Sequence, residues 1–232
     1  MSNYEQKLDS DDPDVLAAYQ AETRGEYQLA LEHYNKALER NPNLGIVYKH
    51  CGNVYYRIGR LSEAEKYLSK AVELLPNYPT ALYELALALY RQVKIKEAIT
   101  LMKKVIEIDP EFLMANYWLG IMNYQYGHIR EAIENYKVVV TKNPDFTIAY
   151  YYLGVAYLRL GRYQEAIDSL NKVIEKNENS PAAYALLGDA YLYMDKKYEA
   201  RQSYKKALEL DPDDRKAQRG LLSLEDFKGI NF

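Results

Sequence analysis

Alanine recurs in this chain every 34 residues, and this period limits the folds that the chain can adopt. The unbroken series is Ala30, Ala64, Ala98, Ala132, Ala166 and Ala200. A second series of small residues has the same period: Ala18, Gly52, Ala86, Gly120, Gly154 and Gly188. Fixed periods of about 20–50 residues are typical of repeat proteins, in which each repeat packs on its neighbours. The two series therefore predict six tandem repeats.

Glycine and proline divide each repeat into two helical segments. Proline follows the second segment and stops it, at Pro42, Pro76, Pro110, Pro144 and Pro212. Glycine lies between the two segments, where a left-handed backbone is often needed, at Gly25, Gly59, Gly127 and Gly161. Val93 and Asp195 take that place in the third and sixth repeats, so we expect those two turns to differ.

The spacing of apolar residues indicates helices. In the fifth repeat we expect helices over 148–160 and 163–175, and Ala166, Ile167, Leu170 and Val173 form one apolar stripe on the second. Two antiparallel helices approach closely only where side chains are short. We therefore expect Gly120 to lie at the contact between the two helices of its repeat.

The predicted organisation is all-α and covers the whole chain. Residues 1–10 form an N-terminal tail, and the helix–turn–helix repeats occupy 11–44, 45–78, 79–112, 113–146, 147–180 and 181–214. The first repeat opens at Asp12-Pro13, a capping residue followed by proline at the first helical position. Residues 215–232 begin a seventh repeat without finishing it. Its apolar residues include Leu221, Leu222 and Leu224. This segment is therefore predicted to be a terminal capping helix with one solvent-exposed face, followed by a tail.

The repeats share a short motif. It reads Tyr48-x₂-Cys51-Gly52-x₂-Tyr55 in the second repeat, Tyr150-x₂-Leu153-Gly154-x₂-Tyr157 in the fifth and Tyr184-x₂-Leu187-Gly188-x₂-Tyr191 in the sixth. With the recurring alanine and proline, this pattern resembles the tetratricopeptide repeat (TPR) family over residues 11–214. The resemblance implies a right-handed superhelical α-solenoid whose first helices line a concave groove. It also implies a protein–protein interaction scaffold or adaptor that holds a peptide or helix of a partner in that groove.

Charge and composition argue against several other classes of protein. The net charge of −3 and the pI near 5.8 give no basic footprint for nucleic acid. The longest apolar run, residues 148–158, is too short to span a bilayer. Cys51 is the only cysteine, so no disulfide can form within the chain. With no signal peptide in the polar N-terminal segment, we expect a cytoplasmic protein.

Catalytic and metal-binding motifs are not found. His33, His50 and His128 lie in different repeats, and no pair has the spacing of metal ligands. The glycines follow the repeat and form no phosphate-binding loop, and no nucleophile motif occurs. The sequence therefore predicts a protein that is not an enzyme and needs no cofactor or metal.

Each first helix has one face that carries none of the packing-motif residues, and we expect this face to line the groove. The predicted partner-binding residues are Lys49, Asn53, Tyr56, Arg57, Tyr83, Leu87, Tyr90, Arg91, Met114, Tyr117, Trp118, Ile121, Tyr124, Ile148, Tyr151, Tyr152, Val155, Leu158 and Arg159. Tyrosine and tryptophan are frequent anchors of interfaces, so this set predicts binding of an apolar or amphipathic segment. The recurring arginines could pair with acidic residues of that segment. An alternative interpretation is that the tyrosines fill gaps between neighbouring helices.

Lys49, Gly52 and Asn53 match part of the motif with which some TPR domains clamp the acidic tails of chaperones. The rest of that motif fails at Glu84, Met114 and Trp118, and a negative Glu84 would repel a terminal carboxylate. We therefore do not expect the full clamp, and keep Lys49 and Asn53 as polar contacts only.

Two alternative functions stay open. Tyrosine stacking with the arginines could bind single-stranded RNA, although the net charge argues against it. The chain could also self-assemble, with residues 1–8 or 227–232 placed in a neighbour's groove.

Asn116 and Asn123 stand on the packing face of the fourth repeat, where amides cost stability unless hydrogen-bonded.

Overall fold

The computed structural model describes residues 11–226, and it confirms an all-α repeat solenoid: within that range there are thirteen helices and no strand. The first helices of the repeats are α1 (Pro13–Thr23), α3 (Gly45–Arg57), α5 (Pro79–Arg91), α7 (Leu113–Tyr126), α9 (Thr147–Arg159) and α11 (Pro181–Tyr193). The second helices are α2 (Tyr27–Arg40), α4 (Leu61–Leu74), α6 (Ile95–Ile108), α8 (Ile129–Lys142), α10 (Tyr163–Lys176) and α12 (Lys197–Leu210). The last helix is α13 (Arg215–Asp226). None of them is long and apolar enough to cross a membrane, as far as the described residues go.

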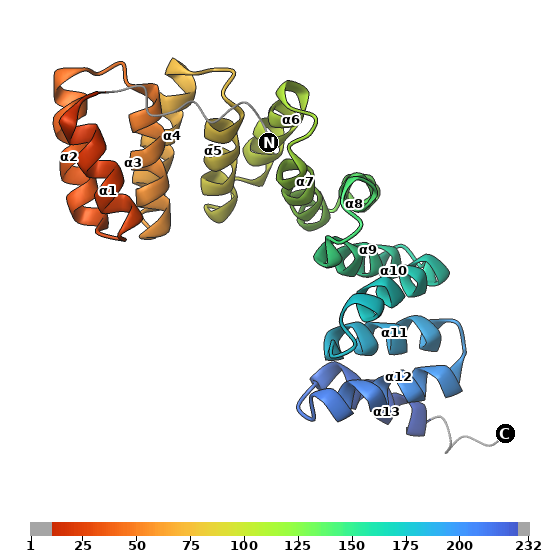
Figure 1. Ribbon diagram of the computed structural model, residues 1–232. Coiled ribbons are helices and arrows are strands. Elements are labelled where there is room, and N and C mark those ends of the chain that lie inside the picture. The colour runs from red at the N-terminus through yellow and green to blue at the C-terminus, as the bar shows by residue number, and fades with distance from the viewer. Residues whose placement is uncertain (1–10, 227–232) are drawn as a thin grey trace. The chain divides into compact units, whose positions relative to one another are not determined.

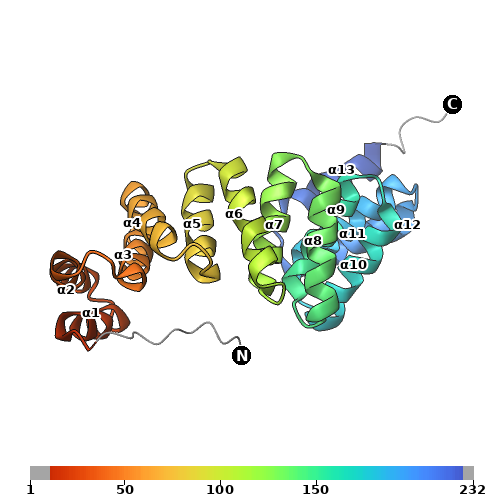
Figure 2. The same cartoon turned by 90° about the horizontal axis from the view of Figure 1, so that it is seen from above.

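The chain divides into two compact units, Met1–Ala115 and Asn116–Phe232, and the division falls inside α7. In the first unit α1 packs on α2, α3 on α4 and α5 on α6 (Figure 1). In the second unit α9 packs on α10, α11 on α12 and α13 on both α11 and α12 (Figure 2). Each predicted repeat range thus encloses one helix pair; the repeat boundaries and the hand of the superhelix stay predictions.

Short polar residues stand at the start of α1 and directly after several of the second helices. Asp12 caps α1, and its Oδ1 accepts a hydrogen bond from the backbone N–H of Asp14 at 2.8 Å. After α6, Oδ1 of Asp109 accepts from the backbone N–H of Glu111 at 3.0 Å, ahead of the next helix. The turn after α10 lacks proline, yet Asn177 makes the same bond to the N–H of Asn179 at 3.1 Å. Side-chain hydrogen bonding therefore closes this turn whether or not proline follows.

The turns inside the third and sixth repeats do not differ from the glycine turns in backbone hand, contrary to our expectation. Val93 has φ 64° and Asp195 has φ 56°, against 79° for Gly59. All three residues close the turn in the left-handed region. The chain adopts this conformation even at valine because both flanking helices are held by packing, and the left-handed backbone is strained for a β-branched residue.

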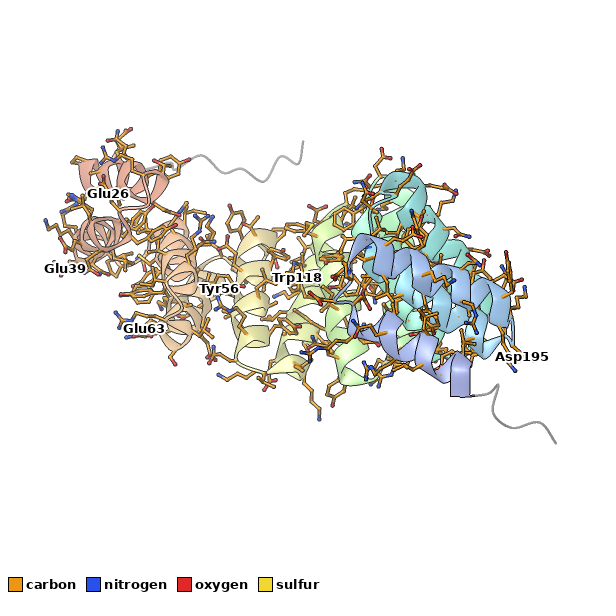
Figure 3. All side chains as sticks on the ribbon, turned by 90° about the horizontal axis from the view of Figure 1, so that it is seen from below. Glu26, Glu39, Tyr56, Glu63, Trp118 and Asp195 are labelled. Atoms are coloured by element: carbon orange, nitrogen blue, oxygen red, sulfur yellow. The ribbon has the colours of Figure 1, made fainter. Side chains whose placement is uncertain are left out.

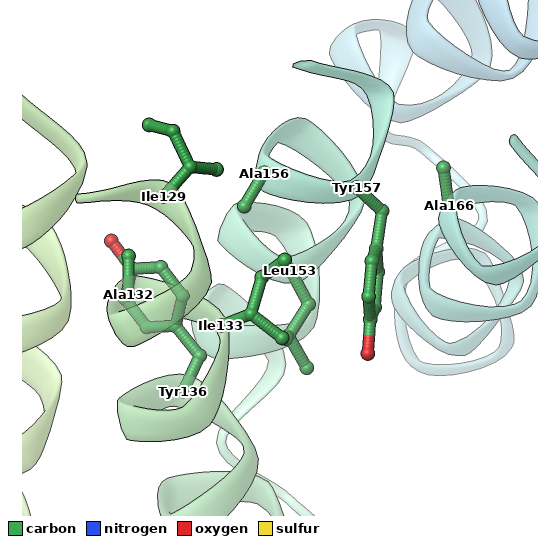
Figure 4. Close-up of a cluster of buried hydrophobic side chains, with 8 residues drawn as sticks. All are labelled: Ile129, Ala132, Ile133, Tyr136, Leu153, Ala156, Tyr157 and Ala166. Carbon is green, nitrogen blue, oxygen red and sulfur yellow. The ribbon is translucent and has the colours of Figure 1, made fainter. Parts of the chain in front are cut away.

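Small residues allow close helix contacts, as expected. Ala132 is fully buried on α8, and a Cβ added to Gly120 would lie 2.4 Å from the ring of Tyr136. Tyr136 is itself fully buried and belongs to a cluster drawn from α8, α9 and α10, which includes Ile133 and Leu153 (Figure 4). The small residues therefore make room for large neighbours from the facing helix.

α13 closes the second unit with one buried side. Ala217 and Leu224 are buried, whereas Leu222, expected among the apolar residues of the cap, is 60% exposed. Residues 1–8 and 227–232, the candidate segments for self-assembly, lie outside the described residues.

The two amides of α7 are buried as the sequence indicates. Asn116 is 4% exposed and Asn123 is 3% exposed, and Nδ2 of Asn116 has no hydrogen-bond partner among the described residues. We have no physical account of why an amide is kept at this place.

Candidate functional site

The predicted partner-binding residues form the first-helix face, and none of them is buried. In the first unit this face comprises Lys49, Asn53, Tyr56 and Arg57 on α3, Tyr83, Leu87, Tyr90 and Arg91 on α5, and Met114 on α7. In the second unit it comprises Tyr117, Trp118, Ile121 and Tyr124 on α7, and Ile148, Tyr151, Tyr152, Val155, Leu158 and Arg159 on α9.

In the first unit, polar side chains of α3 capture a carboxylate of α5. Lys49 Nζ lies 4.0 Å from Oε1 of Glu84, and Asn53 favours the charged form of the same side chain. Arg57 Nε donates to Oδ1 of Asn53 at 2.8 Å, which orients that amide. Lys49 and Asn53 are therefore already engaged inside the protein.

Glu84 is an unusual carboxylate. Its side chain is 19% exposed, and its Oε2 is buried with no hydrogen-bond partner among the described residues. Burial raises the pKa of Glu84 to about 7, although Lys49 and Asn53 work in the opposite direction. Glu84 therefore changes charge near neutral pH, and the repulsion that argues against a carboxylate ligand depends on pH.

A second polar cluster joins the first three helices. The Tyr34 hydroxyl donates to Oε2 of Glu22 at 2.7 Å, and His50 Nδ1 lies 3.0 Å from the same oxygen. Burial opposes ionisation of Glu22, but the hydrogen bond from His50 keeps the pKa of Glu22 below its usual value. Because Tyr34 is fully buried and receives this partner, the cluster ties α1, α2 and α3 together.

Two of the three arginines of the face each stack on a tyrosine of the preceding repeat. The Arg91 guanidinium lies 4.8 Å from the ring centre of Tyr56, and Arg159 lies 5.1 Å from that of Tyr124. The Tyr56 side chain lies on the side of α3 that faces α5 (Figure 3). Stacking restrains each guanidinium at the edge of the face, and Arg91 Nη1 also donates a hydrogen bond to the backbone carbonyl of Tyr56 at 3.2 Å.

In the second unit the face is apolar and partly exposed. Ile148 is 45% exposed, and Tyr151, Val155 and Leu158 are half-buried beside it. The latter three also pack against the core of α10 and α11. These side chains thus have one side in the core and one side in water.

Tyr117 and Tyr152 behave differently from the rest of the face. Tyr152 stacks on the buried ring of Tyr136 at 5.6 Å, and Tyr117 meets Tyr152 at 6.0 Å and Phe146 at 5.2 Å. For these two tyrosines the gap-filling interpretation applies, because their rings complete the packing between α7, α8 and α9.

Nucleophilic and metal-binding groups are not gathered at either part of the face. Among the described residues, no group of three or more histidine, cysteine or acidic side chains is placed to hold a metal ion. Cys51 is buried, and burial raises the pKa of its thiol, so the thiolate is disfavoured.

Profiles of known families match most of the chain. Tetratricopeptide repeat profiles match residues 23–59, 52–93, 79–112, 123–190 and 181–214. The chain belongs to the tetratricopeptide repeat family. Two of the matched ranges, 79–112 and 181–214, are the same as two of the predicted repeats. A search of curated proteins found no match.

Solved TPR structures share the fold. YrrB, described as a TPR protein with an unusual peptide-binding site, has a TM-score of 0.74 at 24% identity, over 80% of this chain and 96% of YrrB. A structure of MamA has a TM-score of 0.67 at 29% identity, over 69% of this chain and 94% of MamA. Part of a TPR protein from Cytophaga hutchinsonii has a TM-score of 0.75 at 20% identity, over 90% of this chain and 84% of the other.

Membership of the tetratricopeptide repeat family supports a protein-interaction scaffold. TPR proteins of this kind are typically non-enzymatic, and they bind protein or peptide partners.

A further site lies on the second helices of the first unit and was not among the predicted residues. An open pocket of about 660 Å³ is lined by Asn35, Leu38, Glu39, Tyr48, Lys66, Tyr67, Ser69, Lys70 and Glu73. The sequence contains one signal for it. At the place of Tyr67 the other repeats carry His33, Leu101, Asn135, Ser169 and Ser203, so tyrosine there is not required by the TPR motif.

Proposed function

We propose that this TPR protein is an adaptor that binds an apolar or amphipathic segment of a partner protein on its first-helix face. The observation that carries this proposal is the partly exposed apolar surface of α9, where Ile148 is 45% exposed beside Tyr151, Val155 and Leu158. Contiguous exposed apolar surface on a soluble protein seldom occurs without a partner. Aromatic side chains that are held rigidly at their base are effective anchors, because little conformational entropy is lost on binding.

The arginines at the edge of the face favour a partner with some acidic residues. Arg91 and Arg159 are held by tyrosine rings, so each can offer N–H groups to a carboxylate at low entropic cost. The likeness to YrrB supports a peptide ligand, since that protein has a peptide-binding site.

A pair of substitutions with opposite expected outcomes tests the proposal. Ile148→Asp places a charge in the apolar surface and should remove the partner recovered by cross-linking and co-purification. Val138→Asp is the matched control, because Val138 lies on the second helix α8 of the same unit and is 37% exposed. Loss of the same partner from both variants, or from neither, would contradict the proposal.

Trp118 provides a direct readout of binding. It is the only tryptophan and is half-buried on α7, so its emission should shift to shorter wavelength when an apolar segment covers it. RNA binding would instead show affinity that falls steeply with salt. Self-assembly would appear as a change in sedimentation with protein concentration.

A further inference from the structure

The pocket on the second helices lies apart from the first-helix face. Its walls come from α2 and α4, and Tyr48 of α3 lies at its base. We call it the α2–α4 pocket. All of its residues belong to the first unit, and it needs no contribution from the second.

Two tyrosine rings form the base of the α2–α4 pocket. The rings of Tyr48 and Tyr67 lie 5.9 Å apart and are tilted by 45°. The ring centres of Tyr67 and Tyr55 lie 5.1 Å apart, and the Tyr67 hydroxyl donates a hydrogen bond to Oδ1 of Asn35 at 3.1 Å. Leu38 adds an apolar side chain that is 9% exposed. The base is thus aromatic and held in place from two directions.

Hydrogen-bonding groups at the pocket remain available. The Tyr67 hydroxyl donates its hydrogen bond to the side-chain oxygen of Asn35, so the side-chain N–H groups of Asn35 can still donate to an occupant of the pocket. The hydroxyls of Tyr48 and Ser69 make no hydrogen bond to any described residue. An occupant can therefore pair its own backbone groups with the pocket.

The rim of the pocket carries opposite charges on its two walls. Lys70 and Glu73 neutralise each other at 2.7 Å. Glu39 on α2 and Lys66 on α4 are exposed, and neither has an ion-pair partner in the described part of the chain. The Glu39 side chain stands at the outer edge of α2 (Figure 3). The α2 wall therefore presents a negative charge and the α4 wall a positive one.

We propose that the α2–α4 pocket binds an aromatic side chain in an extended peptide segment of a partner, with a basic residue beside Glu39 and an acidic residue beside Lys66. A peptide fits better than a free small molecule because the pocket is open, and small-molecule sites enclose most of their ligand. Stacking on tilted tyrosine rings selects an aromatic group. The opposed charges on the two walls select the flanking residues and their order across the pocket.

The test uses short peptides as probes and the isotope-labelled full chain. Acetyl-Lys-Gly-Trp-Gly-Glu-amide should cause saturable shifts of backbone amide signals at Leu38, Tyr48 and Tyr67. Tyr67→Leu, which copies the residue of the next repeat, should weaken binding about tenfold. Tyr150→Leu is the matched control, because Tyr150 holds the place of Tyr48 in the fifth repeat, and it should leave binding unchanged.

A charge reversal keeps the test decisive even if Tyr67→Leu disturbs the fold. Glu39→Lys changes only an exposed side chain and makes both walls positive. At low salt, the ratio of the affinities for the two peptides should then change by about threefold, in favour of acetyl-Glu-Gly-Trp-Gly-Glu-amide over the mixed peptide. Absence of saturable binding, or an unchanged preference in Glu39→Lys, overturns the proposal. The proposal is also overturned if the amide signals of the pocket residues shift with protein concentration in the absence of peptide, because such shifts mean that a second copy of the chain occupies the pocket.

Discussion

Val93 adopts a left-handed backbone at the turn between α5 and α6 and is 77% exposed. A left-handed conformation costs a residue other than glycine about 1–2 kcal/mol, and an exposed side chain returns little packing energy. Val93→Gly should therefore raise the free energy of unfolding by about 1 kcal/mol, after the larger entropy of glycine in the unfolded chain is subtracted. Urea denaturation measures the change.

Two controls separate backbone strain from side-chain effects. Val93→Ala keeps a Cβ at the strained φ and should give a smaller gain than glycine. Asp195→Gly should also gain less, because aspartate tolerates the left-handed region better than valine does. Equal gains in all three variants would mean that strain is not the cause.

Ala132 tests the close packing of α8. It is fully buried within the cluster around Tyr136, so Ala132→Leu should overpack the contact and cost about 1–3 kcal/mol of stability. The matched control is Glu134→Leu on the exposed side of the same helix, which should change stability by less than about 0.5 kcal/mol. Chemical denaturation that finds no difference between the two variants would refute the packing assignment.

At the scale of the element, Glu84 makes the pairing of α3 with α5 depend on pH. Its pKa is raised from 4.5 to about 7, so the folded state holds this proton more tightly than the unfolded state. The stabilising effect of the proton is complete below pH 4.5 and is lost as pH rises through about 7. Glu84→Gln should therefore match the wild-type protein at pH 4.5 and be more stable at pH 8, by on the order of 2 kcal/mol.

The comparison of variants isolates this one carboxylate. Other groups, such as Glu22, have a lowered pKa and contribute in the opposite direction, but they are common to both proteins. Glu97→Gln, at an exposed site on α6, serves as the control and should differ little from wild type at either pH. A stability difference for Glu84→Gln that does not grow between pH 4.5 and 8 would count against the buried-carboxylate interpretation.

At the scale of the whole molecule, stability should depend on the number of complete helix pairs. Deleting residues 79–112 removes α5 and α6 together, so the protein should remain helical and become less stable. Deleting only 79–95 should be far more damaging, since it leaves the apolar side of α6, including Ile99 and Met102, without its partner α5. Circular dichroism with thermal melting distinguishes the two results, and equal damage would contradict the repeat model.

The sequence alone determined the local plan of this protein. The recurring alanine and proline predicted the helix pairs, because in a repeat array each helix packs on neighbours that are close in sequence. In the fifth repeat the expected helices 148–160 and 163–175 agree with Thr147–Arg159 and Tyr163–Lys176 to within one residue at each end. Small residues such as Ala132 could be placed for the same reason, since only short side chains fit where two helices meet.

Only the tertiary structure decided which side chains meet between repeats. Val93 takes a left-handed backbone because packing of the flanking helices outweighs its local preference. Glu84 is captured by Lys49, and Arg91 stacks on Tyr56, because rotamers and helix crossing bring these groups together from different repeats. No periodic pattern specifies such pairs, because each depends on residues that differ from one repeat to the next. The α2–α4 pocket is hidden from the sequence for the same reason: it exists only where Tyr67 meets Tyr48 across two helices.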